Sequence, residues 1–328
     1  MHVRIFRALF HRCLRGTIRP MNPLLRWIIT CFLAFHFRVM AEEKSSVVQQ
    51  KPLLWRIEGA KPSYVFGTIH LANPAVAKID PPVDAAITAS DVLLTEVAFN
   101  PETMAAAAKD MFLPDGAKLA DLLPADLLGE IQAEYERIMP SLGPKLIERM
   151  KIIYATEMVG MLEDQMKNPG RAPLDMLLAS RASALGKKTA GLETMAEQIA
   201  VLNGFTTAEQ ITMLRDSLRL IKEKRKAGTD PTTEMTTAYV SGDLAAVDAW
   251  LNSFMQSSDK AVGEKFIRIL LTERNRRMVE RAVAKMKAEP DKAFFFAVGA
   301  GHLLGETGIL TLLEKAGFKV VRVESAAK

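Results

Sequence analysis

Strand-like segments lie near both ends of this sequence, and a long helical region separates them. Residues 53–58 and 64–70 are short apolar runs typical of strands, and the turn residues between them indicate a β-hairpin. Residues 294–298 and 318–323 are similar runs near the other end. Because apolar side chains recur at three-to-four spacing over residues 101–290, we expect a helical insertion within a single sheet.

Further segments of the same sheet can be predicted from local patterns. Residues 84–90 suit a short helix, and a buried strand is expected directly after it at residues 92–97. A strand, a helix and a strand in so few residues favour parallel pairing. Residues 187–194 look extended, and residues 305–316 are expected to form a helix that ends at Gly317. The predicted fold class is therefore α/β (α+β), with a mixed central sheet formed by the N- and C-terminal segments.

Within the insertion, several signals mark the ends of helices. Thr206 and Glu209 have the spacing of a capping box before an amphipathic run. Pro144 suits the first turn of another helix. Two more helices are expected over residues 232–256 and 263–288.

The first 41 residues have the pattern of an export signal. They contain seven arginines and no acidic residue, and an apolar run of eleven residues extends from Trp27 to Phe37. Val39-Met40-Ala41 then places small or apolar residues at the positions that precede a cleavage site. Since a membrane-spanning helix needs about 20 apolar residues, we expect cleavage before Glu42 rather than a permanent span.

The chain is therefore predicted to have three parts. These are a signal peptide at residues 1–41, a flexible lead at residues 42–52, and a folded domain at residues 53–325. We expect an exported protein, periplasmic or secreted. The alternative is an uncleaved signal that anchors the protein to the inner membrane, and Met21 is an alternative start to Met1.

Charge and cysteine content exclude two classes of function. The leader holds seven of the 43 basic residues, which leaves 36 against 38 acidic residues in the mature chain. A chain so close to neutrality has no general basic field, so we expect no nucleic-acid binding. Cys13 and Cys31 both precede the expected cut, so the mature chain has neither a disulfide nor a thiol nucleophile.

Two Gly-x-x-His stretches are the main candidates for chemistry. Gly67 to His70 and Gly299 to His302 each follow a strand-like run, whereas the other three histidines lie in the predicted signal peptide (His2, His11 and His36). Loops at the carboxyl ends of parallel strands are the usual location of sites in α/β sheets, and glycine leaves room for a ligand. A structural histidine beside a turn glycine is the alternative. Two copies that hold both histidines of the mature chain favour a functional role.

Glu96 is the third candidate, because it lies within the apolar run at residues 92–97. A buried charged carboxylate costs several kcal/mol unless it is paired or bound to a metal. Two histidines and one carboxylate form a familiar ligand set for a catalytic divalent ion, with a position left for water. Such an ion lowers the pKa of its water from about 15.7 to about 7 and polarises a carbonyl group. A salt bridge between Glu96 and Arg274 is the alternative.

The chain also resembles the TraB/GumN family, to which the Tiki metalloproteases belong. The resemblance covers residues 53–323 and depends on five motifs in order: Gly67-Thr68-Ile69-His70-Leu71, Thr95-Glu96, Gly191-Leu192-Glu193-Thr194 with Glu197-Gln198, Arg274-Asn275, and Gly299-Ala300-Gly301-His302-Leu303 followed by Gly305. It implies an α/β fold related to the EreA/ChaN-like group. It also implies a metal-dependent hydrolytic centre that contains both Gly-x-x-His histidines and the strand glutamate.

Residue roles follow from the resemblance by position. His70 and His302 would be metal ligands or catalytic residues, and Glu96 would be a ligand or a base, at a centre that binds a divalent ion (Mn, Co or Zn). Secondary site residues would be Glu193, Arg274 and Asn275, and Asp175 fits a further family position more loosely. The implied activity is hydrolysis of a peptide or protein. The related ChaN-like group binds haem iron, so a non-enzymatic envelope protein that binds haem or metal is the alternative.

Overall fold

The computed structural model of the protein describes residues 51–255 and 258–324. The predicted signal peptide and most of the predicted lead therefore lie outside the described residues. Within the described ranges, no helix is both long and apolar enough to cross a membrane.

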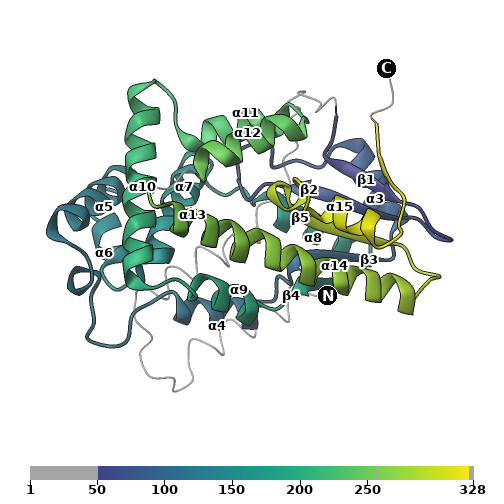
Figure 1. The fold of residues 1–328 in the computed structure, drawn as a ribbon, viewed down its shortest axis with the longest axis horizontal. Coiled ribbons are helices and arrows are strands. Elements are labelled where there is room, and N and C mark those ends of the chain that lie inside the picture. The colour runs from purple at the N-terminus through teal and green to yellow at the C-terminus, as the bar shows by residue number, and fades with distance from the viewer. Residues whose placement is uncertain (1–50, 256–257, 325–328) are drawn as a thin grey trace, which may run out of the picture. The chain divides into compact units, whose positions relative to one another are not determined.

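A six-stranded mixed sheet forms the centre of the fold (Figure 1), with strand order β4-β3-β5-β2-β1-β6. Its strands are β1 (Leu54–Ile57), β2 (Ser63–Thr68), β3 (Val92–Val97), β4 (Lys188–Glu193), β5 (Phe294–Gly299) and β6 (Val320–Arg322). Strand β1 is antiparallel to β2 and β6, whereas β2, β5, β3 and β4 are parallel to one another. The predicted hairpin, the mixed sheet and its formation from both ends of the domain are confirmed.

Strand β5 lies inside the sheet, between β2 and β3. Residues 294–298 are all buried, as expected for a parallel strand that is covered on both faces. Thr68 pairs with Gly299, so β2 and β5 end at the same level. This register sets the two Gly-x-x-His stretches beside each other.

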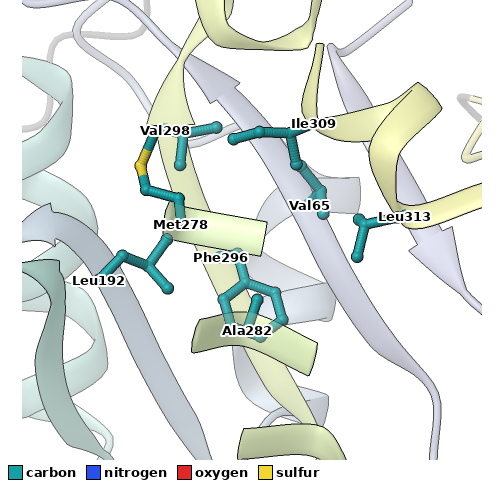
Figure 2. A pocket seen from close by; sticks show the side chains of 8 residues that line it. All are labelled: Val65, Leu192, Met278, Ala282, Phe296, Val298, Ile309 and Leu313. Atoms are coloured by element: carbon teal, nitrogen blue, oxygen red, sulfur yellow. The ribbon is translucent and has the colours of Figure 1, made fainter. Parts of the chain in front are cut away.

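Helices cover the sheet on both sides. Helices α14 (Glu273–Ala288) and α15 (Ile309–Lys315) lie in front of it in Figure 1, and α8 (Leu174–Ala184) lies behind it. Helix α3 (Pro81–Ala89) contributes buried apolar residues to the same core. Figure 2 shows a small cavity between the sheet and the two front helices, lined by apolar side chains such as those of Phe296, Met278 and Leu313. Because this lining is apolar, the cavity is a packing gap in the core.

The segment between β3 and β5 is mainly helical, as predicted, and has a second apolar core. Beyond the elements already given, it contains α4 (Pro101–Asp110), η2 (Leu119–Asp121), α5 (Ala125–Ile138), α6 (Gly143–Ile147), α7 (Ile152–Lys167), α9 (Met195–Leu202), α10 (Thr207–Lys226), α11 (Pro231–Val240), α12 (Leu244–Phe254), α13 (Lys260–Ile267) and η3 (Arg268–Thr272). Ile131 and Tyr135 of α5 and Leu214 of α10 are buried in this second core, which also contains buried residues of α7.

Three expected helices differ in their bounds. The one predicted at residues 232–256 is two helices, α11 and α12, because Gly242 has a φ of +65° and Asp243 caps α12 by accepting from the backbone N–H of Ala245. The one predicted at residues 263–288 contains the π-helical turn η3, which separates α13 from α14.

The C-terminal helix begins later than the predicted residue 305. Gly305 has a φ of +71°, a left-handed conformation that does not continue a helix. A short 3-10 turn, η4 (Ala300–Leu303), comes before it and carries His302. The helix α15 then starts at Ile309, and Gly317 follows its end with a φ of +91°.

Candidate functional site

The carboxyl ends of β2, β3 and β5 bring the predicted site residues together. Glu96 on β3 accepts a hydrogen bond from the backbone N–H of Gly299, with an N–O distance of 2.7 Å. His70 and His302 lie in the segments that follow β2 and β5. This edge of a parallel sheet is the usual place for a ligand. Residues from distant parts of the chain therefore meet at one point.

His70 is the solvent-facing member of this group. Its side chain is 54% exposed, and its Nε2 atom lies 3.9 Å from Oε1 of Glu96. Its Nδ1 atom lies 2.8 Å from Oδ2 of Asp175, in the first turn of α8. The charge of Asp175 is the main cause that raises the pKa of His70 to about 9. Asp175 also accepts a 2.6 Å hydrogen bond from the hydroxyl of Thr68, which fixes its carboxylate.

His302 is the buried member, with a side chain that is 6% exposed. Its Nδ1 atom is 2.6 Å from Oδ1 of Asn275, whose amide nitrogen donates to the carbonyl oxygen of Thr307. Because Oδ1 of Asn275 only accepts, Nδ1 of His302 carries the proton and Nε2 keeps its lone pair. That Nε2 atom lies 3.6 Å from Oε1 of Glu96. Burial is the main cause that lowers the pKa of His302 to about 4, so the ring is neutral.

Glu96 lies between the two histidines and is ionised. Burial alone would raise its pKa, but the positive charges of Arg274 and His70 and the N–H of Gly299 hold that pKa well below its usual range. Its Oε2 atom accepts from Nη2 of Arg274 at 2.6 Å and from Nε2 of Gln198 at 3.3 Å. The other oxygen, Oε1, is the one that faces both histidines.

Glu193 and Arg274 form a closed ion pair behind Glu96. Oε2 of Glu193 accepts from Nε and Nη2 of Arg274 at 2.9 and 2.7 Å, and Oε1 accepts from Arg277 at 3.0 Å. The Glu193 side chain has no exposed surface. Arg274 also donates from Nη1 to the carbonyl oxygen of Leu270. Glu193 therefore orients the arginine, and the arginine in turn contacts Glu96.

The fit of this group to a divalent ion can be tested against its distances. Two ligand atoms at about 2.1 Å from a tetrahedral ion are about 3.4 Å apart, and Oε1 of Glu96 is 3.6 Å from one Nε2 atom and 3.9 Å from the other. In the described residues, no group of three or more His, Cys, Asp or Glu side chains already has the geometry of a metal site. Both distances from Oε1 of Glu96 are therefore within about 0.5 Å of the spacing that two ligands of such an ion require.

Gly299 provides the space beside these three groups. A Cβ atom at this position would lie 3.1 Å from Oε1 of Glu96, 3.5 Å from Nε2 of His70 and 3.6 Å from Cδ2 of His302. The φ of Gly299 is −53°, so its backbone does not require glycine. Glycine at the end of β5 therefore serves to leave space between Glu96 and the two histidines.

The structure brings together all six residues that the sequence singled out: His70, His302, Glu96, Glu193, Arg274 and Asn275. Their catalytic and metal-binding roles stay predictions. The salt bridge expected as the alternative for Glu96 is also present, since Arg274 contacts the oxygen that faces away from the histidines. Sequence reasoning placed Gln198 in a family motif but assigned it no role, and it did not single out Tyr239. No spacing in the sequence indicates the contact of Tyr239 with Gly67.

These features define a class: an α/β protein with two histidines and a glutamate at the carboxyl edge of its sheet. The sequence profile of the TraB/PrgY/gumN family matches residues 53–322. The chain belongs to this family, which confirms the resemblance.

The chain is also similar to curated metalloproteases of the Tiki group. It is 32% identical to metalloprotease TIKI1 of Danio rerio over 307 residues, which cover 81% of this chain and 62% of that protein. It is 28% identical to metalloprotease TIKI1 of Homo sapiens over 320 residues, or 85% of this chain and 63% of that protein. Metalloprotease TIKI2 of Xenopus tropicalis is 30% identical over 308 residues, with shares of 81% and 59%. The chain spans about three fifths of the length of these relatives. No solved structure gives a significant match to it.

Proposed function

We propose that this protein is a metal-dependent hydrolase of peptides or proteins. The observation that carries the proposal is the convergence of His70, His302 and Glu96 at one sheet edge, in a chain similar to metalloproteases. His70 and His302 would hold a divalent ion through their Nε2 atoms, and Glu96 through Oε1. A divalent ion bound there would polarise the carbonyl group of the substrate and lower the pKa of water.

The surrounding residues support this role by fixing protons and orientations. Asp175 and Asn275 each bind the Nδ1 side of one histidine, which turns the Nε2 atom toward Glu96. Arg274 and the N–H of Gly299 stabilise the ionised form of Glu96. Glu193 is enclosed by arginines, so it acts on the site through Arg274 rather than by proton transfer. Glu96 is the acidic residue that could act either as a ligand of the metal ion or as a general base.

The substrate would approach from the side of His70. The His70 side chain is 54% exposed and that of His302 is 6% exposed, so the open part of the group is at the end of β2. We also propose that residues 1–41 direct export and are removed, and that residues 53–325 form the catalytic domain. The haem-binding alternative is an outcome of the test below.

The test is metal content and turnover of residues 42–328, purified without a histidine tag. The protein would be loaded with manganese, cobalt or zinc, measured by mass spectrometry, and assayed on a peptide library. His70→Ala, His302→Ala and Glu96→Gln are expected to lose both the metal and the turnover. Glu130→Gln is the matched control, because Glu130 pairs with Lys222 on the surface of the helical region.

Two results would overturn the proposal. One is the absence of stoichiometric metal in the wild-type protein with each of the three ions. The other is unchanged turnover in either histidine variant. A haem titration that gives a Soret band sensitive to both histidines would favour the non-enzymatic reading.

A further inference from the structure

The loop that carries His70 makes hydrogen bonds with side chains from the helical segment between β3 and β5. At its start, the hydroxyl of Tyr239 on α11 donates to the carbonyl oxygen of Gly67 over 2.8 Å. At its end, Oδ2 of Asp164 on α7 accepts from the backbone N–H of Ala72 over 2.6 Å. Between these contacts, Asp175 on α8 binds the His70 ring. Three different helices therefore hold one short loop.

Asp164 has an unusual position for an acid. The residue is 5% exposed, and burial raises the pKa of its carboxyl group above the usual value. Its carboxylate accepts hydrogen bonds from the N–H of Ala72 and from the side chain of Asn168, and it has no direct ion pair to a cation in the described residues. A buried acid that accepts a hydrogen bond from a backbone N–H group of a distant loop fixes the position of that loop.

The two histidines differ in what keeps them in place. His302 is buried and bound to Asn275, so packing fixes its ring. His70 is more than half exposed, so its position depends on its loop and on Asp175. A shift of the loop at Ala72, two residues along the chain, would move the His70 ring relative to Glu96.

We propose that Asp164 is a positioning residue that holds the loop of His70 in register with Glu96 and His302. This inference rests on the proposed function, because it assigns Asp164 to the geometry of the proposed metal ligands. The proposal also assigns a structural role to the helical insertion. Through α7 and α11, the insertion is a scaffold for the half of the site that faces solvent.

The experiment uses histidine as a probe, because residues 42–328 contain two histidines. Protein labelled with ¹⁵N-histidine gives one set of imidazole signals for His70 and one for His302, assigned with the two alanine variants. In the metal-free protein, Asp164→Ala is expected to shift and broaden the His70 signals and to leave those of His302 unchanged. Asp164→Asn, which keeps an acceptor oxygen, is expected to restore most of the wild-type His70 signal.

Zinc titration of the same samples gives the second readout. Asp164→Ala is expected to weaken zinc binding by about 10- to 100-fold, the usual effect of removing a group that orients a ligand. Tyr239→Phe, which removes the contact at the other end of the loop, should have a smaller effect in the same direction. Glu134→Gln is the matched control, because Glu134 is also a buried acid of the helical region and pairs with Arg225 and Arg137.

The outcomes separate the two proposals. Wild-type protein that binds none of zinc, manganese and cobalt would refute the metal-dependent function, and the metal-free His70 signals would still test Asp164. Folded Asp164→Ala protein with wild-type His70 signals would overturn the positioning role. Equal changes in Glu134→Gln would overturn it as well, since they would show a general loosening of the helical region.

Discussion

Replacing Arg274 with methionine tests the closed ion pair behind the site. Arg274 donates one hydrogen bond to Glu96, two to Glu193 and one to the carbonyl oxygen of Leu270. Its side chain is 9% exposed, and the two carboxylates are 10% and 0% exposed. Removing one partner of a buried charge pair costs about 3–5 kcal/mol. Arg277 and Gln198 still contact Glu193 in the variant, so we expect a loss of about 3 kcal/mol at pH 7.

The pH dependence of this loss follows from Glu96. Its folded-state pKa lies below the ordinary value of 4.5, so ionised Glu96 adds stability above that value, and this stability is lost as the pH falls. Without Arg274, burial is opposed by fewer charges, so the pKa of Glu96 rises. The difference in unfolding free energy between wild type and variant should therefore be largest near pH 7 and shrink below about pH 4.5.

The assay is urea unfolding of metal-free protein at several pH values between 3.5 and 7. Arg219→Met is the control, because Arg219 is 50% exposed and pairs with Asp216 and Glu223 on the surface of α10. Exposed pairs of this kind contribute about 0.2–1 kcal/mol. If Arg274→Met loses no more stability than this control at pH 7, the buried charge argument is wrong.

A further prediction concerns the space at the site. Gly299→Ala is expected to fold normally but to weaken zinc binding by about tenfold or more, because its Cβ atom would lie 3.1 Å from Oε1 of Glu96. Gly301→Ala is the control. Equal zinc affinity for wild type, Gly299→Ala and Gly301→Ala would contradict the prediction.

Much of the sheet could be predicted because its strands are local patterns. The hairpin of β1 and β2, the buried runs of β3 and β5 and the extended segment that forms β4 are each visible within a few residues. Helix bounds were less accurate where a single glycine decides them. Gly242 and Gly305 both take a positive φ, and an apolar pattern does not indicate the sign of φ.

The site residues were predictable for a different reason. His70, His302 and Glu96 lie at strand ends or inside a strand, so the topology of a parallel sheet brings them together once the strand order is known. The contacts of Asp164 and Tyr239 were not predictable. Each belongs to a helix whose packing against the His70 loop depends on side chains far away in sequence, and three-to-four spacing indicates only which helix face is buried.

The central position of β5 also determines when the protein can gain its site during synthesis. This strand follows β3 by about 200 residues but lies between β2 and β3, so a long loop must close before the sheet is continuous. Until residue 294 leaves the ribosome, β2 and β3 have edges without their final partner, and such edges attract chaperones or other chains. Neither the N–H of Gly299 nor His302 is available to Glu96 before that point. A nascent chain that stops before β5 therefore has most of the helices and no complete site, so the proposed hydrolytic activity would begin only when the domain is almost fully made.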